Sequence, residues 1–304
     1  MAKEKKDINE YHLNRDQPGQ PQFAIHNLSN YLKEHQGDTR HPHIHSFYQI
    51  IWFKSGSGKH FVDFKAYDVL KDALFFIAKN QVHYFDQNTQ YTGVLIHFNE
   101  TFLAQNDNET DFFLKGNIFN NPYQQPFCSV DDGMCSILET YLKLISGELN
   151  REEIFGREEL LRTYLKAFLI QVQRVKNKFD KDADKRSFVP DDKKIQLVKF
   201  IDLIELHYTK GLSVSEYAGL LHVSPRTLSD LTRQTLNKTP SQLIQERIVL
   251  EAQRLLLHSS LNVNQIGYRL GFDDASYFVK YFKKYTGTAP LEFRKSIFFA
   301  DQGR

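Results

Sequence analysis

The segments VNQIG (residues 263–267) and GFDDASYFVK (residues 271–280) indicate a short helix, a tight turn and a second helix that begins with polar residues. The same pattern occurs earlier in the chain, as LSVSEYA (residues 212–218) followed by VSPRTLS (residues 223–229). A second helix presented in this way fits the major groove of DNA. One such helix-turn-helix unit is moderate evidence, because helical hairpins with a glycine turn are common. Two in tandem are strong evidence for contact with two groove segments about 34 Å apart.

The ends of the helices around these units are marked by residues that stabilise helix termini. Ser213 with Glu216, and Thr239 with Gln242, have the spacing of a capping box. Pro225 stands where the first turn of a helix tolerates proline. The helices predicted on this basis lie near residues 193–209, 214–221, 225–235, 240–257, 263–269, 274–285 and 290–296. The long fourth helix would then join two three-helix units.

The second helix of each unit divides into a buried face and an outward face. Leu228 and Leu231 are predicted to be core residues of the first unit, and Phe278, Phe282 and Tyr285 of the second. Ser, Thr and Arg near the start of such a helix reach base edges, and Lys reaches phosphates. The predicted DNA-binding residues are Ser224, Arg226, Thr227, Ser229, Asp230, Arg233, Asp274, Ser276, Lys280, Lys283 and Lys284. For any one of them alone, the alternative is an ordinary solvated helix face.

Residues 195–296 resemble the DNA-binding domain of AraC/XylS-type transcription regulators. The resemblance is carried by LHVSPRTL (residues 221–228), IGYRLGF (residues 266–272), SYF (residues 276–278) and TGTAP (residues 286–290). It implies a regulator that recognises promoter or operator DNA, more often an activator than a repressor, with RNA polymerase as a further partner.

The sequence departs from the family pattern at three positions. Thr232 stands where the family usually has an aromatic residue, so the packing of the first unit is expected to differ in detail. Asn237 replaces a glycine, and asparagine tolerates the left-handed conformation that this turn requires. Gly267 replaces an alanine, which is expected to cost its helix about 1 kcal/mol.

The first half of the chain has the pattern of short β-strands from Phe47 to Phe98. Runs rich in β-branched and aromatic residues alternate with turn residues at near-regular spacing. The predicted strands lie at residues 48–53, 59–64, 74–77 and 93–98. Such a pattern predicts a small barrel or sandwich.

Two helices are predicted after these strands, at residues 132–148 and 157–176. The apolar stripe of the second helix consists of Leu161, Leu165, Phe168, Val172 and Val175. This stripe fits equally a helix packed on the barrel and a helix that pairs with its copy in a dimer. Residues 177–192 are rich in Lys and Asp and have the composition of a linker.

Three histidines and a glutamine resemble the two motifs of cupin barrels. In metal-binding cupins, residues at the positions of His43, His45 and Gln49, together with a later residue at the position of His83, are two histidines, a carboxylate and a further histidine. Gln49 takes the place of the carboxylate, so one anionic ligand is missing. The prediction is therefore that no metal is bound and that these histidines are pocket or structural residues.

The resemblance further implies a small effector, such as a sugar, inside the barrel. Aromatic side chains would line the apolar wall of the cavity, and the histidines would make polar contacts with the effector. The predicted effector-binding residues are His43, His45, Gln49, Trp52, Phe61 and His83. For each aromatic residue the alternative is plain barrel core. His60 and His97 are predicted to be ordinary strand residues.

Composition limits the remaining possibilities. Residues 190–304 contain sixteen Lys and Arg against twelve Asp and Glu, a net charge of +4, whereas the rest carries −2. This mild excess fits DNA contact but equally an ordinary surface. Cys128 and Cys135 match no metal or redox spacing. The chain shows no signal peptide and no apolar stretch of about eighteen residues, which predicts a cytoplasmic protein with reduced thiols and no membrane partner.

These observations predict an α+β protein in three parts. Residues 22–176 form a cupin-like effector-binding and dimerisation domain, residues 177–192 a linker, and residues 193–304 a DNA-binding domain. The predicted function is that of a transcription regulator, a homodimer under the control of a small molecule, with no enzymatic activity and no cofactor. One alternative is a metal-dependent cupin enzyme with an accessory DNA-binding tail. Another is an architectural DNA-binding protein without an effector, against which the aromatic barrel argues.

Overall fold

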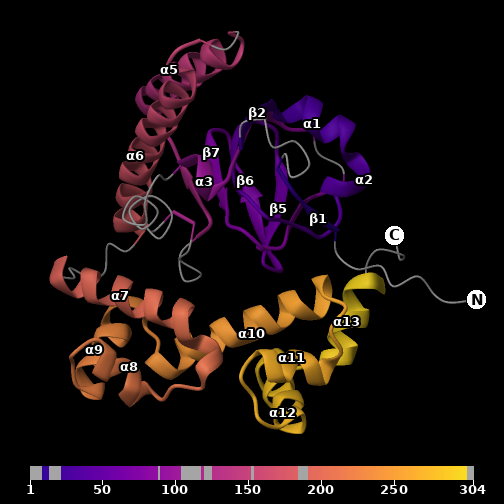
Figure 1. The fold of residues 1–304 in the computed structure, drawn as a ribbon, viewed down its shortest axis with the longest axis vertical. Helices are drawn as coiled ribbons and strands as arrows, with labels where there is room; N and C mark the ends of the chain where they lie inside the picture. The colour runs from indigo at the N-terminus through magenta and orange to yellow at the C-terminus, as the bar shows by residue number, and fades with distance from the viewer. Residues whose placement is uncertain are drawn as a thin grey trace, which may run out of the picture. The chain divides into compact units, whose positions relative to one another are not determined.

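The computed structural model describes residues 9–13, 22–87, 90–103, 118–119, 125–151, 154–183 and 191–299. They belong to two compact units, an N-terminal unit within residues 9–185 and a C-terminal unit within residues 186–304. The N-terminal unit combines strands with helices, and the described part of the C-terminal unit contains helices alone (Figure 1). The prediction of an α+β protein with a sheet-rich first part and a helical second part is confirmed.

The strands form two five-stranded sheets. The first sheet has the order β1 (Asn9–Tyr11), β3 (His43–His45), β8 (His83–Phe85), β5 (Gly58–Val62) and β6 (Lys65–Val69). The second has the order β10 (Phe127–Ser129), β7 (Ala73–Ile77), β4 (Tyr48–Ser55), β9 (Thr92–Phe98) and β2 (Phe23–Asn27). β1 lies ahead of the predicted domain start at residue 22, because Asn9–Tyr11 pair in parallel with β3.

Successive side chains of a strand point to opposite faces of its sheet, and β4 shows both faces. Ile51 and Phe53 belong to a core cluster that also includes Val62 and Phe85 of the first sheet, so this face is the barrel interior. Ile50 and Trp52 belong to a different cluster, on the outer face of the second sheet.

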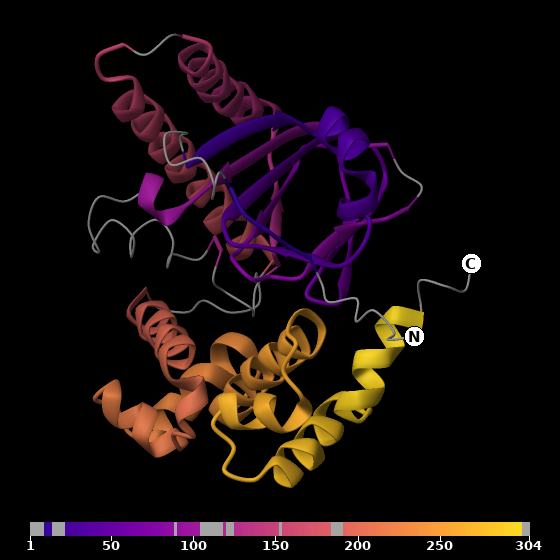
Figure 2. The same ribbon diagram turned by 45° about the vertical axis from the view of Figure 1, so that its right-hand side comes forward.

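Helices α5 (Asp132–Leu149) and α6 (Arg157–Ala183) cover that outer face (Figure 2). Leu138 of α5 and Phe168 of α6 are fully buried in the same cluster as Trp52. The predicted α6 stripe therefore packs within its own chain, as Leu161, Leu165, Phe168 and Val172 are all buried. These side chains are occupied within the chain, and whether the helix also pairs with its copy in a dimer stays a prediction.

Further short elements were missed from the sequence. They are α1 (Leu28–Glu34), α2 (Gln36–Thr39) and α3 (Glu100–Leu103), together with strands β1, β2, β3, β6, β8 and β10. Cys128 of β10 and Cys135 of α5 are both buried, and neither is part of a disulfide.

The predicted linker is in part helical. α6 continues to Ala183 and α7 begins at Asp191, so residues 177–183 and 191–192 belong to helices. Residues 184–190 lie outside the described residues. Lys-rich composition is compatible with a helix whose outer side faces water, and the amide of Gln173 donates a hydrogen bond of 2.8 Å to Asn177 one turn later. Composition alone was therefore a poor guide to the helix end.

All seven predicted helices of the C-terminal unit are present. They are α7 (Asp191–His207, continued by the 3₁₀ turn η1, Tyr208–Lys210), α8 (Val214–Leu220), α9 (Pro225–Leu236), α10 (Pro240–His258), α11 (Val263–Arg269), α12 (Ala275–Thr286) and α13 (Pro290–Phe299). Both predicted capping boxes are formed, at Ser213 with Glu216 and at Thr239 with Gln242. None of the helices described in either unit has the length and apolar character needed to cross a membrane.

The three departures from the family pattern have local explanations. Asn237 caps α9 with a φ of 52°, in the left-handed region, as expected. Thr232 is buried, and its hydroxyl donates to the carbonyl oxygen of Ser229 at 3.3 Å. Gly267 faces the ring of Phe278, and a Cβ there would meet its atoms at 3.1–3.2 Å. The close crossing of α11 and α12 thus offsets the lower helix propensity of glycine.

Candidate DNA interface and histidine cluster

In the first helix-turn-helix unit, α9 presents a polar face opposite a buried one. Leu228 and Leu231 are buried, whereas Arg226, Asp230 and Arg233 are exposed. The predicted residues Ser224 and Thr227 are also exposed, and Ser229 is half-buried. Ser224 is the N-cap of α9, and its hydroxyl accepts a hydrogen bond of 3.0 Å from the backbone of Thr227. The cap fixes the start of the helix from which the arginines project.

In the second unit, α12 also has a buried apolar face opposite an exposed polar one, and its polar face carries more positive charge. Phe278 and Phe282 are fully buried, and Lys280, Lys283 and Lys284 are exposed. Ser276 and Asp274 are exposed, and the Asp274 carboxylate accepts a hydrogen bond of 2.8 Å from the backbone N–H of Ser276. Asp274 therefore caps the helix. The predicted core residue Tyr285 is 39% exposed, which corrects that assignment.

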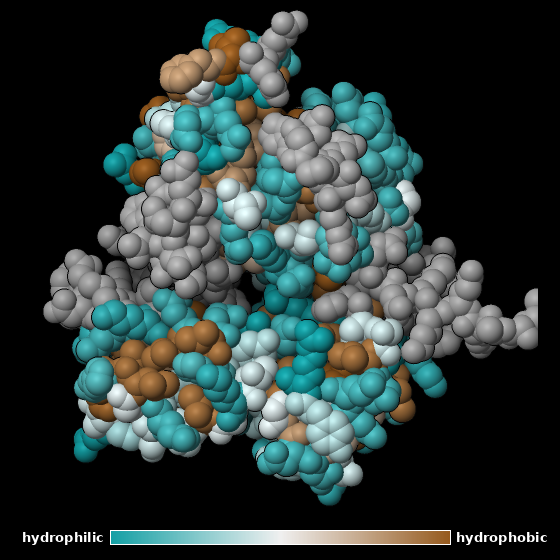
Figure 3. All heavy atoms as spheres, in the orientation of Figure 1, coloured by the Kyte–Doolittle hydropathy of each residue, from teal (hydrophilic) through white to brown (hydrophobic). Residues whose placement is uncertain are grey.

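An aromatic row on α12 was missed from the sequence. Tyr277 is 60% exposed, and Tyr281 and Tyr285 follow it at intervals of four residues. The rings of Tyr281 and Tyr285 lie 4.8 Å apart, and Phe272 lies 5.0 Å from Tyr281. The four-residue spacing of the tyrosines was the signal for this row in the sequence. The prediction used only the i, i+4, i+7 stripe of core residues. Figure 3 shows that the surface of the C-terminal unit mixes hydrophilic and apolar side chains.

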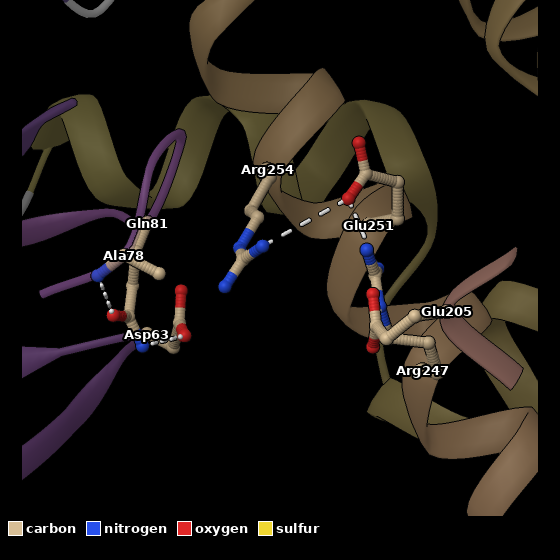
Figure 4. Close-up of polar contacts among 7 residues, drawn as sticks. All are labelled: Asp63, Ala78, Gln81, Glu205, Arg247, Glu251 and Arg254. Atoms are coloured by element: carbon tan, nitrogen blue, oxygen red, sulfur yellow. Dashed lines mark hydrogen bonds and ion pairs between the residues drawn. The ribbon is translucent and has the colours of Figure 1, made fainter. Parts of the chain in front are cut away.

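A buried ion cluster joins α7 to α10 inside the C-terminal unit. Arg247 of α10 donates to the carboxylates of Glu205 at 2.7 Å and Glu251 at 3.0 Å, as Figure 4 shows. Its guanidinium also lies 4.1 Å from the ring of Tyr208 in η1. Arg254 adds a longer ion pair of 3.9 Å with Glu251. Every charge of this cluster has a partner, so the cluster fixes the position of α10, the helix that joins the two units.

A close backbone contact fixes the second unit to the same segment. Gly271, in the turn between α11 and α12, has a φ of 85°. A Cβ there would overlap the carbonyl oxygen of Thr209 in η1. η1 therefore contacts both α10 and the turn of the second unit, and holds the two helix-turn-helix units in one arrangement.

Three of the predicted effector-binding residues form a compact group in the barrel interior. His43 and His45 come from β3, and His83 comes from β8, which pairs with β3. The ring centroids lie 4.3 Å apart for His43 and His83, and 4.9 Å apart for His45 and either of the others. All three side chains are buried. Gln49 of β4 is buried as well and pairs in register with His97 of β9.

The loop before β8 is anchored by one side chain. The amide of Gln81 donates to Asp63 at 2.7 Å, and its oxygen accepts from the backbone N–H of Ala78 at 2.9 Å (Figure 4). Since Asp63 lies in the turn between β5 and β6, these bonds hold the start of β8 against the neighbouring hairpin. His83 is thereby fixed in the barrel interior.

The histidine group extends beyond the predicted residues. His60 of β5 is fully buried, with its ring 5.4 Å from that of His83. His97 is buried with its ring 6.2 Å from that of His45. Both had been interpreted as ordinary strand residues. Their positions depend on which face of each strand is turned inward, which only the pairing of distant strands decides.

Two predicted effector-binding residues point away from this group. Trp52 lies in the outer cluster under α5 and α6, with the ammonium of Lys54 3.4 Å from its ring. Phe61 is half-buried and stacks on Tyr84 at 4.4 Å, and both alternate with the interior residues of β5 and β8. The structure thus does not bring Trp52 and Phe61 together with the histidines. Phe53 and Phe75, near His60, supply aromatic surface of the interior instead.

Burial dominates the electrostatics of the interior. It lowers the pKa of His43 to about 4 and that of His60 to about 3, because a charged imidazole is poorly solvated there. The pKa values of His45, His83 and His97 are also well below the ordinary value, again through burial. At neutral pH these five imidazoles are therefore uncharged. Neutral imidazoles are available to donate, to accept or to bind a metal ion.

The three histidines fit a metal ion by their chemistry. One nitrogen of each of His43, His45 and His83 lies within 4.8 Å of the others. Both ring nitrogens of His45 and of His83 are buried without a hydrogen-bond partner. A buried polar atom without a partner costs free energy, and such atoms are rare in folded proteins. The three imidazoles are therefore the type of ligand that a transition-metal ion takes.

Two family models match the chain, one in each unit. One, described as an AraC-like ligand binding domain, matches residues 28–165, and one described as a helix-turn-helix domain matches residues 217–296. The histidine group lies within the residues that match the first model, and α9 and α12 lie within those that match the second. The chain belongs to the AraC-type family of transcription regulators.

Curated relatives support this assignment. The HTH-type transcriptional activator RhaS of Mannheimia succiniciproducens is 22% identical over 83% of this chain and 88% of its own length. The HTH-type transcriptional activator RhaR of Cronobacter sakazakii is 38% identical over 27% of this chain and 29% of its own. YdeC of Bacillus subtilis, an HTH-type transcriptional regulator, is 26% identical over 40% of each. The chain thus spans less than half the length of two of these three relatives.

Proposed function

We propose that this regulator binds promoter DNA through α9 and α12 and activates transcription when the interior of its barrel is occupied. The observation that carries the proposal is the pair of capped helices, each with an exposed polar face, held in one unit by α10 and η1. Relatives named as activators support the direction of the effect. Promoter DNA as the target makes the cytoplasm the expected location and RNA polymerase the expected partner.

Selection of DNA from a random pool tests the recognition step. Purified full chain is expected to enrich duplexes with two conserved half-sites one helical turn apart, about 10 base pairs between centres. Binding to the enriched duplex is expected to fall steeply with salt, since each neutralised phosphate releases counterions. Equal affinity for enriched and scrambled duplexes would contradict sequence-specific recognition.

Substitutions on the two outward faces assign the contacts. Arg226→Ala and Lys280→Ala are each expected to weaken DNA binding without changing the melting temperature, because both side chains are exposed. A lost bidentate base contact costs about 1–3 kcal/mol and relaxes one position of the site, whereas a lost phosphate contact weakens all sites alike. Lys33→Ala on α1 removes the same charge outside the C-terminal unit and serves as the control. Wild-type binding by both test variants would rule out these faces.

The histidine group is the proposed effector site. His43, His45 and His83 line it, with Gln49, His60 and His97 in the same interior. An occupant acts only if it binds one state of the regulator more tightly than another, and effector and DNA must then change each other's affinity by the same factor. The proposed test is the operator affinity of full chain over a panel of candidate small molecules and ions. No effect from any of them would leave the barrel as a scaffold.

We also infer a homodimer. α5 carries Ile137 and Leu144 seven residues apart, and both are more than two-fifths exposed. Leu160 of α6 adds exposed apolar surface. A two-fold dimer would present two such pairs of helix-turn-helix units to DNA. Sedimentation of the wild type and of an Ile137→Lys, Leu144→Lys variant tests this inference, with a shift to monomer expected for the variant.

A further inference from the structure

We propose that the ligand of the histidine group is a divalent transition-metal ion, bound by one ring nitrogen each of His43, His45 and His83. Its role as the effector rests on the proposed function, whereas its binding does not. The site lies where β3 and β8 pair, in the interior of the barrel. The sequence predicted no metal because a carboxylate is missing at Gln49. The structure instead places one nitrogen of each of the three histidines within 4.8 Å of the others, and the proposal revises that interpretation.

The first argument is the number of ring nitrogens without partners. His45 and His83 each bury two nitrogens with no hydrogen-bond partner. Packing does not explain them, because Leu or Phe fills such space without a polar cost. The surrounding interior is in fact aliphatic and aromatic, with Phe85 and Ile77 among its members. Unpaired polar atoms in an apolar core require an explanation, and for His45 and His83, whose nitrogens lie close to one of His43, a shared ligand supplies it.

The second argument is the tautomer of His43. Its Nδ1 lies 2.8 Å from the carbonyl oxygen of His41. A carbonyl oxygen only accepts, so Nδ1 carries the proton and Nε2 keeps its lone pair. A ring N–H bonded to a backbone carbonyl is the usual support of a metal-binding histidine, since it fixes both tautomer and ring orientation. His43 therefore offers Nε2 to the ion.

The donor set decides the class of ion. The group contains imidazoles alone, with no carboxylate and no thiolate. Ca²⁺ and Mg²⁺ need oxygen ligands, so they do not fit. Cys128 and Cys135 lie in the outer cluster and do not take part. Imidazole ligands suit Zn²⁺, Ni²⁺, Co²⁺ and Cu²⁺.

The number of ligands decides how the ion is held. Structural zinc sites have four protein ligands, whereas sites with three keep an open position. Three neutral ligands also leave the charge of the ion uncompensated in a buried site, which weakens binding. The uncompensated charge favours an ion that enters and leaves, and the open position sets the site apart from a structural zinc site. Reversible occupancy is what an effector site requires.

Cobalt binding to untagged full chain, freed of metal with a chelator, is the direct experiment. Co²⁺ is the probe, because its visible absorption reports imidazole coordination, and Zn²⁺ is added in competition. One equivalent of Co²⁺ per chain, displaced by Zn²⁺, is the expected result. No saturable binding of either ion would overturn the proposal.

Two matched variants identify the ligands. His83→Leu removes a proposed ligand, and His26→Leu removes a half-buried histidine of β2 that lies outside the histidine group. Co²⁺ affinity is expected to fall at least about a hundredfold in His83→Leu and to stay as in the wild type in His26→Leu. Equal loss in both variants, or retention in both, would overturn the assignment. Melting curves in chelator check folding, and His45→Gln replaces His83→Leu if the latter does not fold.

The effect on DNA is measured separately with the selected operator. Zn²⁺ is expected to change the operator affinity of the wild type about 5–150-fold and to leave that of His83→Leu unchanged. If Zn²⁺ binds as described but the operator affinity does not change, the metal site stands and the proposed control by barrel occupancy fails. If Zn²⁺ does not bind but DNA selection succeeds, the recognition function stands and the metal site fails.

Discussion

The two units bury polar groups in opposite ways. In the C-terminal unit, Arg247 is 8% exposed, and two carboxylates and the ring of Tyr208 compensate its charge. In the N-terminal unit, His45 and His83 are at least as buried, and their ring nitrogens have no hydrogen-bond partner. A buried polar cluster with partners holds elements in place, whereas one without partners is a candidate ligand site. The Arg247 cluster is therefore assigned a structural role, and the histidine group is the candidate ligand site.

The largest expected effect is the loss of stability of the N-terminal unit in acid. The histidines have pKa values near 6.5 when unfolded and lower values when folded, about 4 for His43 and 3 for His60. Below pH 6.5 the unfolded state therefore binds more protons, and stability falls with pH by up to about 1.4 kcal/mol per pH unit for each histidine. The loss begins near pH 6.5 and grows as the pH falls towards 5.

Urea unfolding followed by tryptophan fluorescence measures this effect. Trp52 is the only tryptophan of the chain and lies in the N-terminal unit, so its signal reports that unit. With chelator present, the midpoint is expected to fall between pH 7.5 and pH 5. A midpoint that stays constant over this range would show that the buried histidines are not neutral in the folded state.

The next largest effect is expected from Arg247→Met. Removal of the guanidinium leaves Glu205 and Glu251 close together without its compensating charge, although Arg254 still pairs with Glu251 at 3.9 Å. Both are partly solvated, so a loss near the lower end of the range for buried ion pairs is expected, about 3 kcal/mol. Lys238→Met breaks an exposed pair with Glu246 and is the control, with a loss below about 1 kcal/mol. Equal losses for both would remove the distinction between a structural and a surface ion pair.

A smaller loss of stability is expected from Gly271→Ala. A left-handed backbone costs a residue with a Cβ about 1 kcal/mol, and the contact with Thr209 adds to this because backbone atoms must move. The expected loss is about 2 kcal/mol or more. His222 has a φ of 55° at the matching turn of the first unit and is exposed. His222→Gly is accordingly expected to stabilise the C-terminal unit slightly. If Gly271→Ala and His222→Gly changed stability alike, the proposed role of the contact between Gly271 and η1 would be contradicted.

The smallest effect, with the opposite sign to that of Arg247→Met, is expected from His60→Leu. Both ring nitrogens of His60 are buried without partners, and Phe53, Phe75 and Phe85 surround the ring. An apolar side chain removes the cost of burying them, so stability in chelator is expected to rise by about 1 kcal/mol. Chemical denaturation at pH 7.5 measures it. A clear loss of stability would show that His60 has a structural role.

The contrast between the units also explains what the sequence could predict. Helix ends depend on residues three or four apart, so Ser213, Thr239 and Asn237 marked them correctly. The inward faces of strands depend on pairing between distant segments. Trp52 and Phe61 were therefore assigned to the wrong face, and His60 and His97 were missed. The cupin-like spacing predicted that His43, His45 and His83 lie close together. It could not predict that ring nitrogens of His45 and His83 have no hydrogen-bond partner, because this depends on the packing of distant strands around them.

The most direct test of the central claim is the affinity of full chain for its selected operator, with and without Zn²⁺, in the wild type and in His83→Leu. If an occupant of the histidine group controls recognition, Zn²⁺ shifts the affinity of the wild type about 5–150-fold and does not shift that of the variant. Equal operator affinity with and without Zn²⁺ in a wild-type chain that binds the ion would contradict it.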